Sequence, residues 1–443
     1  MVPKKVAHEA ALSRHATPIR RRVGVSAAAS TVVAILALSG CTSGSGGTTT
    51  AKTAGPIPAA PQGTNSSSDK PSTPAAPKAV ITAAPAAGAL ISPVQPVTVA
   101  VKDGQLTSVK LINPDGKAVA GQLAADGSSW KNTEELGYSK TYTLSAVAKG
   151  ADGTAASKKT NFTTVTPNNM TMPYMQRPGG YGLDNGATYG VGIVPVVHFD
   201  ESITDKKAAE KSLTVTTNPK VEGSWNWVDD TNVHWRPRQY FKPGTKVTVS
   251  AKVYGVQVGS GLYGQADKSV SFKIGAKHIA VSDDVSKTVK VYFNDKLVRT
   301  MPTSMGRGGY VDGKNGIKIS LSTMSGIYTV IAHENPATMS SASYGLPADS
   351  PAGYAPEKIY WATKISTDGI YLHELNATVW AQGNTNVSHG CLNMNTDNAS
   401  WYYQHAQTGD IVKITTAGPK LEIWQGGDWS VPWATWVKGS AQH

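Results

Sequence analysis

Residues 387–393, with the sequence VSHGCLN, place a thiol, an imidazole and a glycine close together in the chain. A cysteine thiol with a pKa near ~8.5 is mostly protonated at neutral pH, so it needs a base or a cationic partner before it can attack a carbonyl. His389 lies on the same side as Cys391 if the backbone is extended. His373, which closes the apolar run 370–373 of an expected strand, is the other candidate base. Spacing alone does not choose between them, but either pairing indicates nucleophilic acyl transfer.

The sequence contains two cysteines, Cys41 and Cys391. If Cys41 carries a lipid, as the next paragraph argues, Cys391 has no partner for a disulfide. A lone thiol in an oxidising compartment is open to oxidation, which a purely structural position could avoid by being Ser, Ala or Val. The cysteine count therefore favours a chemical role for Cys391.

Residues 1–40 have the pattern of a targeting signal. Six basic residues precede an apolar run at 23–38, which is short for a membrane span and suits a secretory leader. The run ends in Leu38-Ser39-Gly40-Cys41, which resembles the bacterial lipobox, although a plain secretory signal is the alternative. We expect a signal peptide over 1–40, lipidation of Cys41, and a membrane-anchored protein that faces the cell wall from outside the cytoplasm.

The net charge does not indicate a nucleic-acid partner. The formal charge is +12 for the whole chain and +7 without residues 1–40. A modest positive charge suits an anionic cell envelope and is equally common in soluble basic proteins. The remaining sequence has no dense basic block interleaved with aromatic residues, so we expect no nucleic-acid binding.

The chain divides by composition into a tether, two β-rich segments and a final region. Residues 41–87 are rich in Gly, Ser, Thr, Pro and Ala and have too few large apolar residues for a core, so we expect a disordered tether. Residues 88–166 and 167–276 contain short alternating runs separated by Asp-Gly pairs and other turn signals. Each of these two segments is therefore expected to form an all-β sandwich, with its Trp and Tyr residues mainly in the core.

The region 277–416 must position the thiol. Apolar runs at 289–293 and 327–331 predict strands, and the Ser/Pro/Gly-rich stretch 332–353 predicts a long lid or binding loop without regular structure. A helix should follow the cysteine, with Asn395 or Thr396 as its N-cap and Gly409 as its stop. A last strand is expected at 410–414. The Trp-rich tail 417–443 should pack on a neighbouring domain.

The motif His373, fourteen intervening residues, then Ser388-His389-Gly390-Cys391 and Asn393 resembles the signature of the YkuD-type L,D-transpeptidase catalytic domain. The resemblance continues through residues 301–306, 344–354, 361–366 and 381–383. With the leader and the β-rich segments, the chain is similar to the mycobacterial or actinobacterial lipoprotein branch. The resemblance implies an all-β dominated fold, with two immunoglobulin-like sandwiches before a mixed β-sandwich catalytic domain that has a short helix after the nucleophile.

The resemblance also implies roles for individual residues. Cys391 would be the nucleophile and His373 the general base and acid, while His389 and Gly390, with the Cys391 amide, would shape the turn and the oxyanion hole. The remaining expected site residues hold the stem peptide or form the lid: Tyr354, Asp368, Gly369, Asn393, Ser388, Met339 and Tyr344. Relatives often have Ser after the base histidine where this chain has Glu374. We expect its backbone carbonyl to orient the imidazole, which makes the exchange tolerable.

The implied reaction is a two-step acyl transfer. Cys391 would attack the amide between the third residue and the terminal D-Ala of a tetrapeptide stem, and D-Ala would leave. The side-chain amine of a neighbouring stem's third residue would then resolve the thioester, giving a 3→3 cross-link in peptidoglycan without a metal or organic cofactor. Carbapenem-type β-lactams are expected to acylate the same thiol, because a strained acyl donor mimics the amide.

Other readings of the sequence remain open at this stage. Water could resolve the thioester, which would make the protein an L,D-carboxypeptidase, or the acceptor amine could belong to a protein lysine. The sandwiches could also serve a non-catalytic wall-binding scaffold. Zinc binding has little support, because His373-Glu374 and His333-Glu334 begin H-E-x-x-H patterns that fail at Ala377 and Ala337. The S-x-x-K pattern at 128–131 lacks the S-D-N and K-T-G elements of serine-type enzymes.

Overall fold

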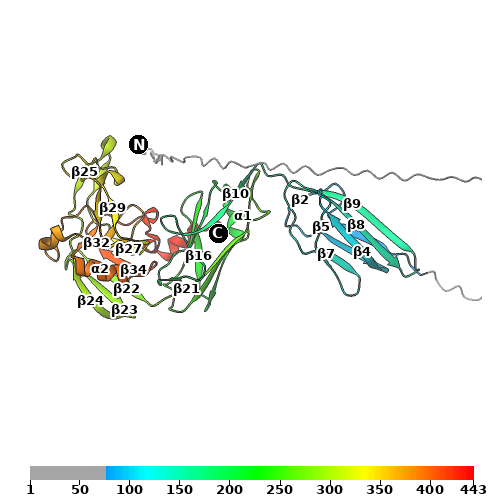
Figure 1. Cartoon of the computed structure of the whole chain (residues 1–443), viewed down its shortest axis with the longest axis horizontal. Helices are drawn as coiled ribbons and strands as arrows, with labels where there is room; N and C mark the ends of the chain where they lie inside the picture. The colour runs from blue at the N-terminus through cyan, green and yellow to red at the C-terminus, as the bar shows by residue number, and fades with distance from the viewer. Residues whose placement is uncertain (1–75) are drawn as a thin grey trace, which may run out of the picture. The chain divides into compact units, whose positions relative to one another are not determined.

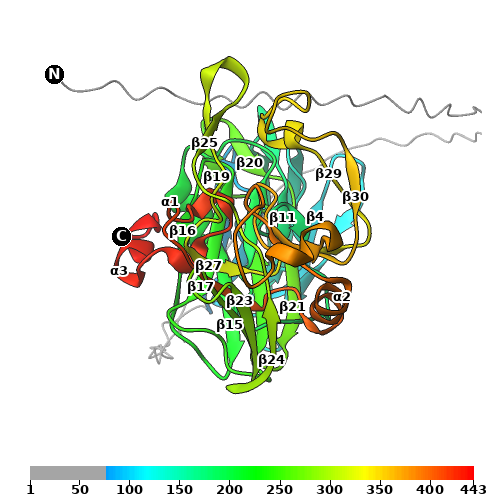
Figure 2. The ribbon, with the colours of Figure 1, turned by 90° about the vertical axis from the view of Figure 1, so that its left-hand side faces the viewer.

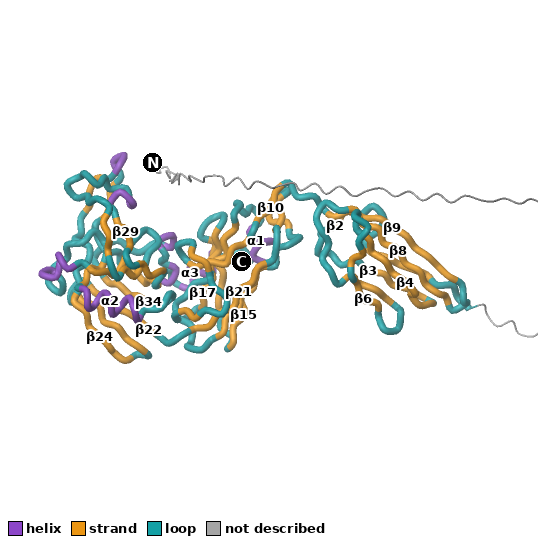
Figure 3. Tube along the Cα trace, in the orientation of Figure 1, coloured by secondary structure: helices purple, strands orange, loops and turns teal. Residues whose placement is uncertain are grey.

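The computed structural model describes residues 76–443 (Figure 1), so the expected signal peptide, the lipidation site Cys41 and most of the tether lie outside the described residues. Strands dominate what is described, and the helices are few and short (Figure 3). This confirms the predicted all-β dominated fold class. In the described part of the chain, no helix is long and apolar enough to span a bilayer.

The first sandwich consists of two antiparallel-rich sheets that enclose one core, in which Leu111, Leu144 and Phe162 are almost completely buried. One sheet has the order β1 (Val80–Ala84), β3 (Thr98–Lys102), β7 (Ser129–Asn132) and β6 (Gly121–Leu123). The other has the order β2 (Leu90–Ile91), β9 (Ala155–Thr164), β8 (Thr141–Gly150), β4 (Gly104–Ile112) and β5 (Ala118–Val119). Strands β3, β8 and β9 contain most of the residues of three such alternating runs of the sequence, at 97–101, 141–144 and 162–165.

The end of the predicted tether is wrong, because residues 80–84 form the strand β1. They pair with β3 from Val80 opposite Lys102 to Ala84 opposite Thr98, and Ala79 is buried in the sandwich core. Composition missed this strand because its residues are mostly small. The backbone pairing with β3 places it at a sheet edge, where few large side chains are needed.

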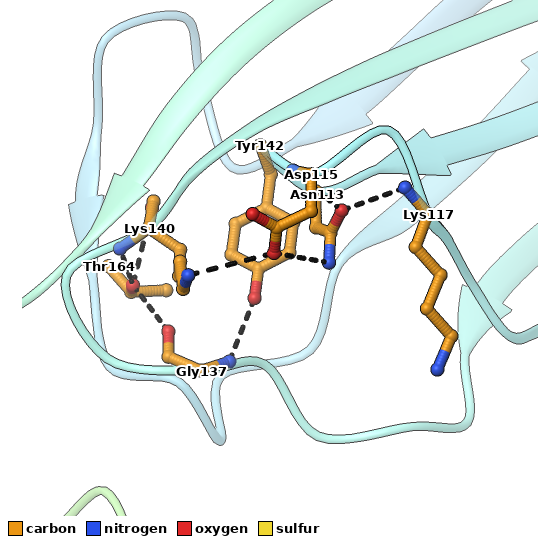
Figure 4. A network of polar contacts seen from close by, with 7 residues as sticks. All are labelled: Asn113, Asp115, Lys117, Gly137, Lys140, Tyr142 and Thr164. Carbon is orange, nitrogen blue, oxygen red and sulfur yellow. Dashed lines mark hydrogen bonds and ion pairs between the residues drawn. The ribbon is translucent and has the colours of Figure 1, made fainter. Parts of the chain in front are cut away.

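Polar contacts fix the loop that leads into β8 (Figure 4). The hydroxyl of Tyr142 accepts a hydrogen bond from the backbone N–H of Gly137 at 2.8 Å. Thr164 donates to the Gly137 carbonyl at 2.6 Å and accepts from the backbone of Lys140 at 3.0 Å. Because the side chains of Tyr142 and Thr164 satisfy backbone groups of this loop, the loop is held against the ends of β8 and β9.

The second sandwich has its own core, in which Trp225 and Trp235 are among the buried residues, as the sequence predicted for this domain's aromatic residues. Its main sheets have the orders β12 (Tyr181–Gly182), β11 (Pro173–Arg177), β14 (Val196–Phe199), β17 (Asn232–Pro237), β16 (Gly223–Trp227), and β13 (Thr188–Tyr189), β21 (Lys268–Ile274), β18 (Lys246–Ala251), β15 (Leu213–Asn218). A smaller sheet and a helix complete it: β10 (Asn169–Thr171), β20 (Leu262–Gly264), β19 (Gln257–Gly259) and α1 (Lys206–Lys211).

The last domain contains two larger sheets and two hairpins. The five-stranded sheet has the order β24 (Lys296–Pro302), β23 (Thr288–Phe293), β22 (His278–Asp283), β34 (Ile411–Thr415) and β27 (Gly326–Thr329). The four-stranded sheet, which positions the cysteine motif, has the order β28 (Ala332–Glu334), β31 (Ala362–Lys364), β32 (Tyr371–Glu374) and β33 (Leu392–Met394). The hairpins are β25 (Tyr310–Asp312) with β26 (Lys318–Ser320), and β29 (Ala337–Met339) with β30 (Glu357–Ile359).

The stretch 332–353 is more regular than predicted. It contains β28, β29 and the 3-10 helix η2 (Ser341–Tyr344), so the prediction of a long structureless loop is wrong. Its strands are only three residues long and pair with β31 and β30, which come later in the chain. The alternation within such short strands gives too weak a local signal, and their partners are set by tertiary contacts.

The helix after the cysteine is confirmed as α2 (Thr396–His405), visible beside the β-sheets in Figure 2. Its predicted stop at Gly409 is wrong, because the helix ends at His405 with Ala406 as the C-cap. The side chain of Asn395 caps it by accepting from the backbone N–H of Asn398 at 2.9 Å. Asp397 in the first turn has the charge that the helix dipole favours. The cap and the dipole together explain why this helix could be located from sequence.

The Trp-rich tail contacts the second sandwich, close to β16, as Figure 1 shows for the red C-terminal segment. The indole N–H of Trp429 donates to the Gly192 carbonyl at 2.7 Å, and that of Trp436 donates to the Ser224 carbonyl at 2.9 Å. Trp436 has no exposed surface, and it lies in the short helix α3 (Trp433–Trp436). The tail therefore joins the catalytic domain to the sandwich before it through buried aromatic contacts.

Candidate active site

The thiol and the imidazole come from neighbouring strands of the four-stranded sheet. β32 and β33 run parallel, with Leu372 opposite Leu392 and His373 opposite Asn393. His373 is near the end of β32, and Cys391 immediately precedes β33. Two residues that are eighteen positions apart in sequence are therefore brought to the same region of the sheet.

A cavity of about 200 Å³ contains most of the predicted site residues. Cys391 and His373 both line it. The other predicted residues in its walls are His389, Ser388, Asn393, Tyr354 and Met339. Gly390, Asp368, Gly369 and Tyr344 are not part of the lining, although Gly369 contacts the thiol.

His373 is arranged as a neutral base. Its Nδ1 lies 2.8 Å from the backbone carbonyl of Glu374, the acceptor expected from the sequence. A carbonyl only accepts, so Nδ1 carries the proton and Nε2 keeps a free lone pair. The side chain is 4% exposed, and burial lowers its pKa to about 4, although the hydrogen bond to Glu374 opposes this shift. At neutral pH the imidazole is therefore uncharged and able to accept a proton.

Cys391 is a neutral thiol in the resting enzyme. It is a free cysteine with a partly exposed side chain, and Sγ donates to the Gly369 carbonyl at 3.6 Å. Burial raises its pKa to about 12, the backbone of Tyr371 lowers it, and the charge of Asp368 raises it further. The thiolate must therefore form during the reaction, with a base that is already uncharged.

The turn before Cys391 is fixed by three hydrogen bonds. Ser388 donates to the Cys391 carbonyl at 2.7 Å and accepts from the Gly390 amide at 3.1 Å. Thr323 donates to the Gly390 carbonyl at 2.7 Å. Gly390 has a φ of +147°, which side chains rarely adopt, and this explains the glycine. Within residues 76–443 the Cys391 amide has no protein acceptor, so it is available to a developing oxyanion.

His389 contacts the segment 340–354, which is the expected lid. Its Nε2 donates to the Ala352 carbonyl at 2.8 Å, and its ring lies 5.3 Å from that of Tyr354. Burial lowers the pKa of His389 below its ordinary value. Sequence left open which histidine acts as the base, and this arrangement favours His373, because Nε2 of His389 already donates to a carbonyl.

The expected lid, segment 340–354, has contacts within itself. The backbone N–H of Tyr354 donates to the hydroxyl of Ser341 at 2.9 Å, and the ring of Tyr344 lies 6.5 Å from that of Tyr354. Sequence reasoning missed several residues of the cavity wall: Glu357, Ile359, Leu375, Thr378 and Val387. Glu357 and Ile359 are two positions apart in β30, so the strand alternation would have revealed them had β30 been predicted.

The described residues contain no group of three or more His, Cys, Asp or Glu side chains placed to hold a metal ion. His333 lies in β28 with its ring 5.1 Å from that of Tyr403, in an edge-on contact. Burial lowers its pKa. The incomplete H-E-x-x-H patterns thus correspond to two separate strands of one sheet.

Comparison with known proteins agrees with this geometry. Residues 276–414 match the L,D-transpeptidase catalytic domain family, and residues 89–257 match a bacterial Ig domain family. L,D-transpeptidase 2 of Mycobacterium tuberculosis strain CDC 1551 / Oshkosh is 43% identical over 349 residues, which cover 78% of this chain and 81% of that protein. L,D-transpeptidase 5 of strain H37Rv is 37% identical over 359 residues, covering 79% and 74%.

A solved structure of L,D-transpeptidase 3 from Mycobacterium tuberculosis, in complex with a faropenem-derived adduct, is 29% identical with a TM-score of 0.43 and covers 52% of this chain and 95% of that chain. The curated relatives are aligned over most of their own length as well as most of this chain. Their identity, together with the catalytic-domain match, shows that this chain belongs to the L,D-transpeptidase family.

Proposed function

We propose that this enzyme cross-links peptidoglycan by acyl transfer, with Cys391 as the nucleophile and His373 as the general base and acid. The observation that carries the proposal is that the thiol and an imidazole with a free Nε2 line one cavity, together with Tyr354 and Met339 from the expected lid. Membership in the L,D-transpeptidase family supports the reaction class, and the named relatives supply no support for the hydrolytic alternative.

In the first step, the Cys391 proton moves to Nε2 of His373 as Sγ attacks the carbonyl that precedes the terminal D-Ala. The negative charge on the carbonyl oxygen is stabilised by the free Cys391 amide. The imidazolium then protonates the leaving amine, so D-Ala departs and a thioester remains. Nδ1 stays bonded to the Glu374 carbonyl throughout, which keeps the ring in one orientation.

In the second step, the side-chain amine of a neighbouring stem attacks the thioester, and His373 takes up the amine's proton and returns one to sulfur. The walls at Tyr354, Met339 and Ile359 are aromatic or apolar, and they limit the access of water to the thioester. His389 supports this by holding the lid through Ala352. These features favour transfer to an amine over hydrolysis.

Placement at the cell envelope is the finer part of the proposal. We propose that residues 1–40 are removed, that Cys41 receives the lipid, and that residues 42–79 connect the anchor to the first sandwich. The basic residues, the apolar run and the lipobox-like ending at Cys41 support it. Metabolic labelling with a radioactive fatty acid should mark the protein, and the Cys41→Ala variant should remain unlabelled.

Product analysis with a defined disaccharide tetrapeptide tests the reaction. A transferase releases D-Ala and forms a cross-linked dimer, whereas a carboxypeptidase forms only the tripeptide. The Cys391→Ala variant should form neither product. In a pull-down with isolated cell walls, the amount of this variant that binds should equal that of the parent. Unchanged dimer formation by Cys391→Ala would contradict the proposal, and tripeptide as the sole product of the parent would establish the hydrolase.

A further inference from the structure

The turn 366–370 holds the resting thiol. Its Gly369 carbonyl accepts the hydrogen bond from Sγ of Cys391 at 3.6 Å. Gly369 has a φ of +102°, which favours glycine at this position. Ser366 closes the turn from within, because its hydroxyl accepts from the Ile370 amide at 2.8 Å and donates to Asp368 at 2.5 Å. The position of the Gly369 carbonyl therefore depends on how Asp368 is held.

Asp368 was expected to hold the stem peptide, but both of its carboxylate oxygens bind other parts of the protein. Oδ1 accepts from Ser366, and Oδ2 accepts from Nε2 of Gln425 at 2.7 Å. Asp368 also lies outside the cavity lining. These contacts support a role in positioning the turn, with Gln425 as the partner from outside it.

The side chain of Gln425 is itself held in one orientation. Its side chain is 6% exposed, and its Oε1 accepts from the Glu422 amide at 2.9 Å, so the amide group has a defined orientation. Its own carbonyl accepts from the Thr367 amide at 3.1 Å. The Trp424 carbonyl accepts from the Thr367 hydroxyl at 2.7 Å. Residues 424 and 425 therefore contact the turn at three points.

The tail that carries Gln425 is anchored beyond the catalytic domain. Three residues later, Asp428 lies 2.6 Å from Nδ1 of His234 in β17, and both side chains are buried. Trp429 and Trp436 add the hydrogen bonds to the second sandwich described above. A segment fixed at both ends can hold a turn in place more firmly than a free loop can.

We propose that Gln425 is a positioning residue for the transpeptidase reaction: by holding Asp368, it keeps the Gly369 carbonyl against the Cys391 thiol. The inference rests on the proposed role of Cys391 as nucleophile. The sulfur atom then has one preferred rotamer before substrate arrives, and only the S–H bond must rotate from the Gly369 carbonyl toward Nε2 of His373 when the attack begins. Gln425 lies outside the cavity lining, so it would act only through Asp368 and Gly369.

The test replaces one contact and then restores it. Gln425→Glu keeps an oxygen for the Glu422 amide but sets a carboxylate against Asp368, so the turn should shift. The double variant Gln425→Glu with Asp368→Asn reverses donor and acceptor and should restore the bond. The matched control is Trp424→Ala, whose side chain is 61% exposed and whose carbonyl contact is retained.

Two measurements separate positioning from general damage. The S–H stretching band of Cys391, obtained as an infrared difference spectrum against Cys391→Ala, should move to the frequency of a thiol without an acceptor in Gln425→Glu. With disaccharide tetrapeptide, kcat should fall between about ten- and a hundredfold in this variant while KM stays nearly constant. Both quantities should return in the double variant and remain at parental values in Trp424→Ala.

An unchanged band and unchanged kcat in folded Gln425→Glu would overturn the proposal, as would a double variant that folds but stays impaired. If Gln425→Glu does not fold, the double variant alone decides, because only a restored contact gives it parental kcat and band. Failure of the proposed function would look different: the parent itself would form no dimer, while the S–H band would still report on the turn.

Discussion

Raising the pH from 6 to 10 should increase the rate at which iodoacetamide alkylates Cys391 in the resting enzyme about tenfold per pH unit. The reagent reacts with the thiolate, and burial raises the thiol's pKa to about 12, so the thiolate fraction grows tenfold per unit over this whole range. A free cysteine with a pKa near ~8.5 would have a thiolate fraction roughly three orders of magnitude larger at pH 7.

The charge state of His373 determines whether an ion pair could alter this profile. Burial lowers the pKa of His373 to about 4, so moving a proton from the thiol to the imidazole costs on the order of 10 kcal/mol for isolated groups. Attraction between the resulting charges returns about 4 kcal/mol at close range. The neutral pair therefore dominates, and the ion pair forms only when a carbonyl is attacked.

Intact-protein mass spectrometry can follow alkylation at each pH, with Cys391→Ala as the baseline. His373→Gln should leave the slope and the rates nearly unchanged, since a neutral imidazole contributes no charge to the resting thiol. A rate plateau between pH 6 and 8 would show a preformed thiolate–imidazolium pair and refute this reasoning. A hundredfold loss of alkylation in His373→Gln would refute it equally.

Three further outcomes follow from the same structure. Between pH 6.5 and 4 the unfolded chain protonates His373 but the folded protein does not, because burial lowers the pKa of His373 to about 4. About 3 kcal/mol of folding free energy is therefore lost as the pH falls from 6.5 toward 4. Calorimetry should show a smaller loss of stability in acid for His373→Gln. Trp436→Ala should lower the free energy of unfolding by about 3–5 kcal/mol, because a fully buried indole and its hydrogen bond are lost, whereas exposed Trp424→Ala should have little effect in urea titration. A carbapenem should add its mass to the parent and leave Cys391→Ala unmodified; an adduct on a serine would contradict the assignment.

Much of the fold and the site could be predicted because local signals were strong. Asn395 and Asp397 located the start of α2, and the alternating runs located the longer strands such as β18. The cysteine motif located the site because a thiol, a glycine with an unusual φ and a nearby histidine occur together. The Glu374 carbonyl could be anticipated since any residue after His373 supplies one.

What sequence missed depends on contacts between distant segments. The strand β1 forms only because β3 offers it an edge, and β30 forms only against β29. The contact between Asp368 and Gln425 could not be predicted, because the two residues lie fifty-seven positions apart. Asp368 and Gln425 come into contact only when the C-terminal tail packs on the second sandwich, so nothing in the local sequence around either residue predicts the contact.

The most direct test of the central claim is to trap the acyl-enzyme. The parent protein, mixed with disaccharide tetrapeptide and quenched in acid within one turnover, should gain the mass of the donor minus D-Ala. Peptide mapping should place this mass on Cys391, with none on the Cys391→Ala variant. A cross-linked product formed without any adduct on Cys391, or with the adduct on another residue, would contradict the account.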